Sequence, residues 1–217
     1  LFNVLSGFID GDSSNAYAEL LADGYRNIGN IPATTLYDFC NAFPTLLHEW
    51  MWLVLTCYDL PNDLFNVIKC LYTSITVFSS GCGDGSFLFN VLCGVRTGCP
   101  LSSILFLICV NLIIDLVLLL SDGPKLSHTR VCADDFGSAM KSLKTLEIQK
   151  PIFALAARVA GLHLKFSKCV IIVTVISLTP QVKQAIQAWL ASDIPEFSEL
   201  RIVISGKFLG WHLGVNA

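Results

Sequence analysis

Two adjacent carboxylates, Asp134 and Asp135, stand in the segment "RVCADDFGSAM" of residues 130–140, where small and apolar residues flank them. Short β-prone stretches precede and follow the pair, which predicts a tight hairpin turn. Neighbouring carboxylates repel each other, and burial raises their pKa values unless a cation compensates. Such a turn can hold Mg²⁺, which takes few protein carboxylates and completes its shell with water and phosphate oxygens. A solvated turn is the alternative, because aspartate is common in turns.

A third carboxylate, Asp38, ends the β-prone stretch "TTLYDF" of residues 34–39. If this strand neighbours the hairpin, Asp38 and Asp134 lie within one metal bridge of each other although 96 residues separate them. Three carboxylates in that arrangement suit two metal ions and an in-line phosphoryl displacement.

The elements that would position these carboxylates are a mixture of helices and strands. Apolar spacing predicts helices over residues 15–25, 44–58, 63–75, 101–120, 142–160 and 179–192, the last capped by Thr179. Strands are expected over 34–39, 86–92 and 169–178, a turn at 81–85, and a glycine-broken hairpin over 207–214. Because the elements do not alternate strictly as strand, helix, strand, the predicted class is α+β.

Composition predicts a globular chain with an uneven charge distribution. The 217 residues are 53% hydrophobic and 14% charged, enough to bury a large core. Residues 1–95 carry a net charge of −7 and residues 96–217 a net charge of +4, so a polyanionic partner should contact mainly the second part. The nine cysteines are odd in number and lack CxxC spacing, which favours reduced thiols in an intracellular protein over a disulfide framework or zinc site. The first residue is Leu1, and we expect the sequence to be part of a longer one.

Residues 101–120, "LSSILFLICVNLIIDLVLLL", are long enough to cross a bilayer. Asn111 and Asp115 interrupt this run, and an aspartate near a bilayer centre costs about 2.5–3.5 kcal/mol. We therefore expect a helix buried beneath a sheet, with Asp115 at its edge or paired, and no membrane partner; a membrane span is the alternative.

Six segments, taken together and in order, resemble the motifs of one protein family. They are "GFIDG" at 7–11, "LYDFCNAF" at 36–43, "GVRTGCPLSSILF" at 94–106, "CADD" at 132–135, "AGLHLKFSKC" at 160–169 and "KFLG" at 207–210. The chain resembles the reverse transcriptase domain of non-LTR (LINE-type) retrotransposons. The resemblance implies a right-hand polymerase fold over residues 1–217, with an antiparallel palm sheet backed by helices, a partial fingers region, and no thumb.

The resemblance also implies an activity and its partners. The activity would be RNA-directed DNA synthesis, with an RNA template, a DNA primer and dNTPs, in the nucleus or cytoplasm. Asp38 and Asp134 would bridge two Mg²⁺ ions, for which Mn²⁺ is an alternative. Asp135 and the carbonyl of Phe39 would complete the metal ligands, and Lys168 would approach the triphosphate as a proton donor.

Four further residues would contact the nucleotide or the template. Phe43 matches the family's steric gate against a ribose 2′-OH, although an aromatic in a core is the alternative. Thr97, Gly98 and Pro100 would shape the loop beneath the template and incoming nucleotide; without the resemblance, Gly98 and Pro100 indicate only a turn and a helix start.

Some positions differ from the family's pattern. Thr97 stands in place of glutamine, Cys132 in place of an aromatic residue, and Asp12 in place of a basic residue. A catalytically inactive relic, or a nucleic-acid-binding palm fragment, is therefore the alternative function.

Overall fold

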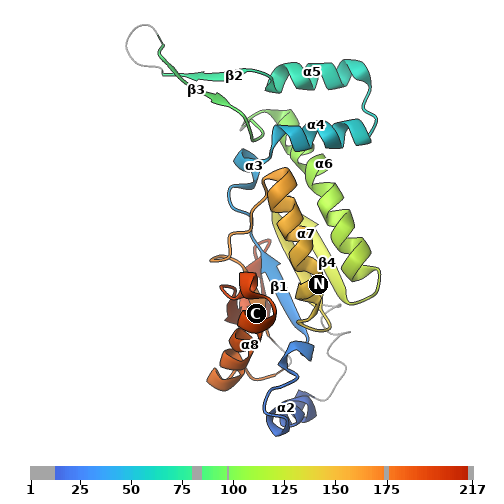
Figure 1. The fold of residues 1–217 in the computed structure, drawn as a ribbon, viewed down its shortest axis with the longest axis vertical. Coiled ribbons are helices and arrows are strands. Elements are labelled where there is room, and N and C mark those ends of the chain that lie inside the picture. Colours follow the sequence, from blue (N-terminus) through green and yellow to red (C-terminus); the bar gives the residue numbers. More distant parts are fainter. Residues whose placement is uncertain (1–12, 80–84, 97, 174–175, 215–217) are drawn as a thin grey trace. The chain divides into compact units, whose positions relative to one another are not determined.

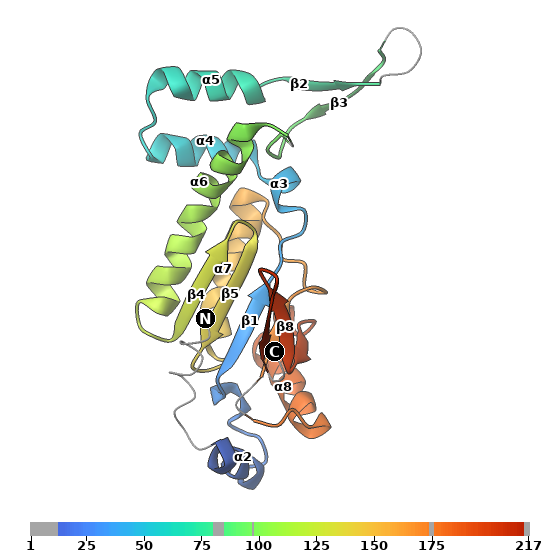
Figure 2. The same cartoon turned by 180° about the vertical axis from the view of Figure 1, so that it is seen from behind.

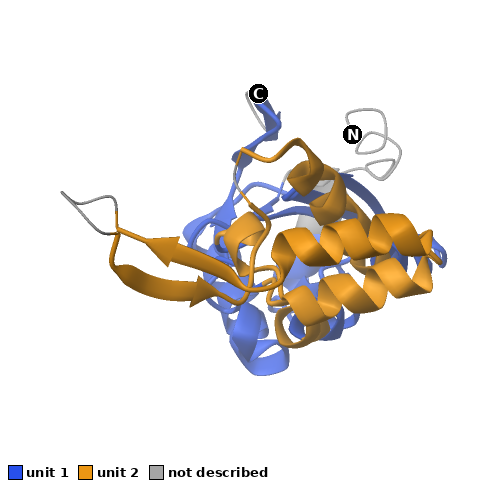
Figure 3. Cartoon of the chain, turned by 90° about the horizontal axis from the view of Figure 1, so that it is seen from above, with its two compact units in different colours: residues 1–40, 114–154, 163–217 blue, residues 41–113, 155–162 orange. Residues whose placement is uncertain are grey.

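The computed structural model describes residues 13–79, 85–96, 98–173 and 176–214. The chain divides into two compact units (Figure 3). Unit 1 comprises residues 1–40, 114–154 and 163–217, and unit 2 comprises residues 41–113 and 155–162. Thr97, Asp12 and most of the turn expected at 81–85 lie outside the described residues. The α+β class predicted from the sequence is confirmed.

Unit 1 is built on a five-stranded sheet in the order β4-β5-β1-β6-β7. Its strands are β4 (Ser127–Cys132), β5 (Asp135–Met140), β1 (Ala33–Tyr37), β6 (Val170–Ile172) and β7 (Arg201–Val203). The first four pair in antiparallel fashion, as expected, but β7 runs parallel to β6. The antiparallel sheet expected from the sequence is thus confirmed for these four strands. The fifth strand is parallel because α8 (Pro180–Asp193) links β6 to β7, and a helical crossover returns the chain in the same direction.

The strand expected over 169–178 is much shorter than predicted, since β6 covers only Val170–Ile172. Val173 and Ile176 are buried without belonging to a strand. An apolar, β-branched run predicts burial more reliably than it predicts strand pairing. This is why the length of the strand was overestimated. The chain then enters α8, where the Thr179 side chain accepts a hydrogen bond from the Val182 N–H, so the predicted cap is confirmed.

One face of the sheet is covered by α7 (Thr145–Ala160), as Figure 1 shows. The ring of Phe153 on α7 lies 4.5 Å from that of Tyr37 on β1 and 5.4 Å from that of Phe136 on β5. Tyr37 and Phe136 are directly paired across the two strands, and both point to this helical face. The helix expected over 142–160 thus exists and backs the sheet.

The opposite face of the sheet carries the hairpin of β8 (Ser205–Phe208) and β9 (Trp211–Gly214), drawn in dark red in Figure 2. The hairpin predicted over 207–214 is therefore confirmed and begins two residues earlier. Its apolar contacts with β1 and β6 form one buried cluster, consisting of Leu36, Val170, Ile172, Phe208 and Leu213. Glycine at 137 makes this contact possible, because a Cβ there would lie 3.1 Å from the Phe208 ring.

The amino-terminal part of unit 1 contains α2 (Ser13–Ala22) and the short 3-10 helix η1 (Ile28–Asn30). The helix expected over 15–25 is therefore confirmed with earlier bounds.

A second 3-10 helix, η3 (Pro195–Phe197), follows α8. The Trp189 ring of α8 packs so closely on Gly29 that a Cβ at residue 29 would lie 2.8 Å from it.

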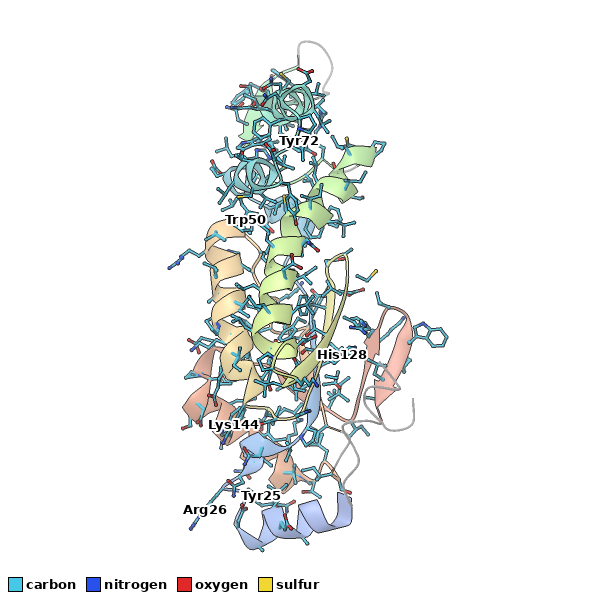
Figure 4. All side chains as sticks on the ribbon, turned by 90° about the vertical axis from the view of Figure 1, so that its right-hand side faces the viewer. Tyr25, Arg26, Trp50, Tyr72, His128 and Lys144 are labelled. Atoms are coloured by element: carbon cyan, nitrogen blue, oxygen red, sulfur yellow. The ribbon has the colours of Figure 1, made fainter. Side chains whose placement is uncertain are left out.

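Unit 2 contains α3 (Ala42–Thr45), α4 (His48–Cys57), α5 (Asn62–Tyr72), the hairpin of β2 (Ile75–Phe78) and β3 (Phe87–Val91), and most of α6 (Pro100–Val117). Two side chains labelled in Figure 4 tie α4 and α5 to α6. Trp50 donates from Nε1 to the Cys109 carbonyl at 3.0 Å, and the Tyr72 hydroxyl lies 3.0 Å from Ser102 Oγ.

The single helix predicted over 44–58 is two helices, because the chain is extended at Leu46 and Leu47. The Leu46 carbonyl accepts from the Gly94 N–H at 2.6 Å, and the Leu47 N–H donates to the Ala160 carbonyl at 2.9 Å. Two glycines permit these close approaches. A Cβ at Gly94 would lie 2.5 Å from the Pro44 carbonyl oxygen, and one at Gly161 would collide with the Thr45 carbonyl oxygen.

Helix α6 continues into a π-helical turn, η2 (Leu118–Asp122). Residues 100–113 belong to unit 2, and the rest of the helix belongs to unit 1, where Asp122 bonds to β4. Asp115 is exposed, as expected of a residue at the edge of the helix. By length and composition alone, Pro100–Asp122 could also cross a membrane, a criterion that the core helix of a soluble protein satisfies equally. Helix α6 is not buried throughout, since Ile104 and Leu107 are exposed.

Candidate active site

Asp38 and Asp135 are brought together by the pairing of β1 with β5. The register places Tyr37 opposite Phe136, so continuing it by one residue puts Asp38 opposite Asp135. Because Tyr37 and Phe136 point to α7, and because successive side chains of a strand alternate, Asp38 and Asp135 project from the opposite face. The two carboxylates therefore share the face that carries the β8–β9 hairpin.

Asp134 lies in the two-residue turn between β4 and β5, as the sequence predicted. Its neighbour Ala133 has a positive φ of 54°, a conformation that costs a residue with a Cβ about 1 kcal/mol or more. The turn exposes both Asp134 and Asp135. The backbone thus accepts local strain to present two carboxylates at the end of the hairpin.

The neighbouring carboxylates affect the ionisation of Asp135. The pKa of Asp135 is raised, first by partial burial and then by the negative charges of Asp134 and Asp38, while Lys168 acts in the opposite direction. A divalent cation would relieve this repulsion, so the donor set fits the metal ions that the sequence predicts. Among the described residues, however, no three acidic, histidine or cysteine side chains already converge on one point as a metal cluster.

Lys168 reaches the site through the turn that precedes β6. The Lys165 N–H donates to the Asp38 carbonyl at 2.7 Å, and the Lys168 N–H donates to the Lys165 carbonyl at 2.8 Å. This turn places Lys168 Nζ 3.3 Å from Asp38 Oδ2. The ion pair is substantially exposed, so its contribution to stability is small. Beneath it, burial raises the pKa of Cys169 to about 11, which keeps the thiol protonated at neutral pH.

A pocket of about 280 Å³ opens beside this ion pair. Charged residues of its lining are Asp38, Asp135, Lys168 and Arg201, and residues 205–208 of β8 line it as well. Arg201, at the start of β7, has no counterpart in the sequence predictions. Only the order of the strands brings it to the site, and no local motif marks it.

A larger cavity, of about 680 Å³, lies at the other end of β1. Glu19, Asp23, Asn27 and Asn30 supply its polar wall, and none of the described residues that line it is basic. A cavity with that lining does not suit a phosphate-bearing ligand, so the smaller pocket is the better candidate for an active site.

The model of one family, reverse transcriptase (RNA-dependent DNA polymerase), matches residues 2–213. The chain belongs to the reverse transcriptase family. The matched range includes the segments that contain Asp38 and Asp134.

Two solved telomerase structures share the fold of this reverse transcriptase domain. The telomerase from Candida albicans in complex with a fragment of telomeric RNA aligns with a TM-score of 0.58 at 13% identity, over 98% of this chain and 32% of that chain. A Candida tropicalis telomerase truncated from its C-terminal domain aligns with a TM-score of 0.57 at 13% identity, over 98% of this chain and 43% of that one. The domain thus spans less than half of either telomerase chain. No curated protein matches the sequence.

The residues predicted to contact the nucleotide lie in unit 2 of the reverse transcriptase domain. The ring of Phe43 stacks on that of Phe106 at 4.2 Å and 15°, and Phe43 is half-buried. Gly98 has a φ of +84° with open space around its α-carbon, and Pro100 begins α6, as predicted. Phe39, the other predicted metal ligand, lies in unit 1, where it bridges to Leu164.

A chain of buried polar side chains lies beneath the carboxylates, on the face that α7 covers. Tyr37 donates from its hydroxyl to Gln149 Oε1 at 2.7 Å, and Gln149 Nε2 donates to Ser138 Oγ at 2.8 Å. Ser138 Oγ lies 3.3 Å from Thr129 Oγ1, which donates to Asp122 Oδ1 at 2.9 Å. Burial raises the pKa of Tyr37 well above its ordinary value, so the phenol stays a donor. No local sequence motif marks this chain of hydrogen bonds, because its members come from separate elements.

Proposed function

We propose that the domain catalyses RNA-directed DNA synthesis, adding dNTPs to a primer 3′-OH by two-metal phosphoryl transfer. The observation that carries the proposal is the common pocket lined by Asp38 and Asp135, which continue the β1–β5 register beside the turn that presents Asp134. The family match supplies the reaction class, because reverse transcriptases are RNA-dependent DNA polymerases.

The roles of the site residues follow from this chemistry. Asp38 and Asp134 would hold both metal ions, with Asp135 and the Phe39 carbonyl as further ligands. Two Mg²⁺ ions, or Mn²⁺ in their place, would supply charge stabilisation for the attacking and leaving oxygens. Lys168, whose Nζ lies 3.3 Å from Asp38 Oδ2, would donate a proton to the leaving pyrophosphate.

For the nucleotide, Phe43 would exclude a ribose 2′-OH by its bulk, and Thr97, Gly98 and Pro100 would shape the loop beneath the base and template. The open space around Gly98 supports a loop position that a ligand can approach. The stacking of Phe43 on Phe106 supports a rigidly held ring, which a steric gate requires.

The partners would be an RNA template, a DNA primer and dNTPs, in an intracellular protein with no membrane association. The RNA complex of the Candida albicans telomerase supports an RNA partner for this fold. We further propose that residues 1–217 form the palm and part of the fingers of a non-LTR retrotransposon enzyme, on the basis of the six ordered motifs. The departures at Thr97 and Cys132 favour one competing function, a nucleic-acid-binding palm without catalysis.

Primer extension on an RNA template tests the proposal. With Mg²⁺ and dNTPs, the chain should extend an annealed DNA primer, and Asp38→Asn and Asp134→Asn should each abolish extension. Asp193→Asn, at the exposed end of α8, is the matched control and should extend like the parent. Template–primer binding without any extension would instead establish the non-catalytic function.

A further inference from the structure

Four charged side chains form a row across one end of the sheet of unit 1. Asp135 starts β5, Asp38 follows β1, Lys168 precedes β6 and Arg201 starts β7. These strands are consecutive neighbours in the order β5-β1-β6-β7. The charge along the row therefore changes from negative, at the two carboxylates, to positive, at Lys168 and Arg201.

Arg201 faces the same side of the sheet as the carboxylates. Its partner in the register is Val170, and its N–H donates to the Cys169 carbonyl at 3.3 Å. Val203, two residues further on, packs against the cluster beneath the β8–β9 hairpin. Side chains two apart in a strand share a face, so Arg201 points to the hairpin face and lines the pocket there.

The guanidinium of Arg201 makes no ion pair or side-chain hydrogen bond with any described residue. An arginine offers five donors in a planar fork that matches phosphate oxygens. An unpaired arginine that lines the same pocket as Lys168, together with the carboxylates proposed to hold metal ions, has the chemistry to receive a phosphate group.

We propose that Arg201 and Lys168 form a subsite for the pyrophosphate portion of the nucleotide, which is the leaving group of the reaction. This proposal rests on the proposed function and adds a residue to it. Because Asp38 and Asp135 line the same pocket, they repel an anion until a divalent metal compensates them. Binding of pyrophosphate should therefore depend on Mg²⁺.

Lys207 provides a matched control from the same pocket. It lies on β8, between Gly206 and Phe208, both of which pack toward the sheet. Alternation therefore directs the Lys207 side chain away from the sheet, and it is exposed. Lys207→Gln removes one positive charge at the pocket rim without removing a donor from the row.

Calorimetric titration of the full chain with inorganic pyrophosphate, with and without Mg²⁺, tests the subsite. The parent should bind only with Mg²⁺, and Arg201→Gln and Lys168→Gln should each weaken binding about fivefold, equivalent to about 1 kcal/mol. Lys207→Gln should stay within about twofold of the parent, and Arg201→Lys should recover part of the loss. Thermal unfolding of each variant reports on folding.

Two outcomes would overturn the subsite and are distinguishable. If Asp38→Asn abolishes Mg²⁺-dependent binding while Arg201→Gln binds like the parent, Arg201 does not contribute to pyrophosphate binding. The proposed metal site would then still stand. If neither substitution changes binding, or if the parent binds no pyrophosphate with Mg²⁺, the subsite is wrong; a parent that nevertheless extends primers would leave the proposed function intact.

Discussion

Replacing Gln149 by leucine tests whether the buried polar chain stabilises the sheet that carries the carboxylates. Gln149 is fully buried, and its amide joins the hydroxyl of Tyr37 on β1 to that of Ser138 on β5. Leucine has a similar size and no polar atom, so the substitution removes both hydrogen bonds with little change in volume.

The expected loss of stability depends on which hydrogen-bond partners remain in Gln149→Leu. Tyr37 loses the acceptor of its hydroxyl, while Ser138 keeps Thr129 at 3.3 Å. An orphaned buried polar group costs about 1–3 kcal/mol. With one group fully and one partly orphaned, Gln149→Leu should lower the free energy of unfolding by about 2–4 kcal/mol, a large share of the 5–15 kcal/mol typical of a domain.

A double-mutant cycle with Tyr37→Phe isolates the Tyr37–Gln149 contact. Once the Gln149 acceptor is absent, removing the Tyr37 hydroxyl also removes an orphaned donor. The double variant should therefore be about 1–2 kcal/mol more stable than the sum of the single effects predicts. Urea unfolding followed by circular dichroism gives each value. Gln187→Leu, on the exposed face of α8, is the control and should change stability by no more than about 0.5 kcal/mol. A strictly additive cycle, or a loss below about 1 kcal/mol for Gln149→Leu, would refute the reasoning.

Three further predictions concern the glycines, the acidic site and the gate. Gly161→Ala, whose Cβ would collide with the Thr45 carbonyl oxygen, should lower the urea midpoint far more than Gly98→Ala, which has open space and costs only the strain of about 1 kcal/mol for a positive φ. Because the pKa of Asp135 is raised in the folded chain, ionisation of this carboxyl opposes folding. Without divalent metal, Asp135→Asn should therefore be more stable than the parent at pH 7, and the difference in unfolding free energy should shrink as the pH falls toward 4. Urea titrations at several pH values measure this difference. Phe43→Val should raise rNTP relative to dNTP incorporation in primer extension, and unchanged sugar discrimination in an active parent would make Phe43 a packing residue only.

The hairpin that presents Asp134 and Asp135 could be predicted because its signal is local. β-prone stretches on both sides of a polar pair allow few alternatives, and the same holds for the end of β1 at Asp38. The Thr179 cap was predictable for the same reason, since proline at the first helical position fixes the start of α8.

Features that depend on distant segments could not be predicted in this way. The break at Leu46 and Leu47 exists because Gly94 and Ala160 supply backbone partners there, and neither is near in sequence. Arg201 reaches the pocket only because β7 pairs in parallel with β6. A single sequence shows which residues favour a strand, but it does not show which other strand will lie beside that strand in the sheet.

Titration of the chain with Mn²⁺, followed by electron paramagnetic resonance of the free ion, tests most directly whether the three carboxylates form a metal site. We expect the parent to bind Mn²⁺ and to lose that binding in Asp38→Asn and in Asp134→Asn, while Asp193→Asn binds as the parent does. Mn²⁺ binding that is equal in all four proteins would contradict the assignment of the active site.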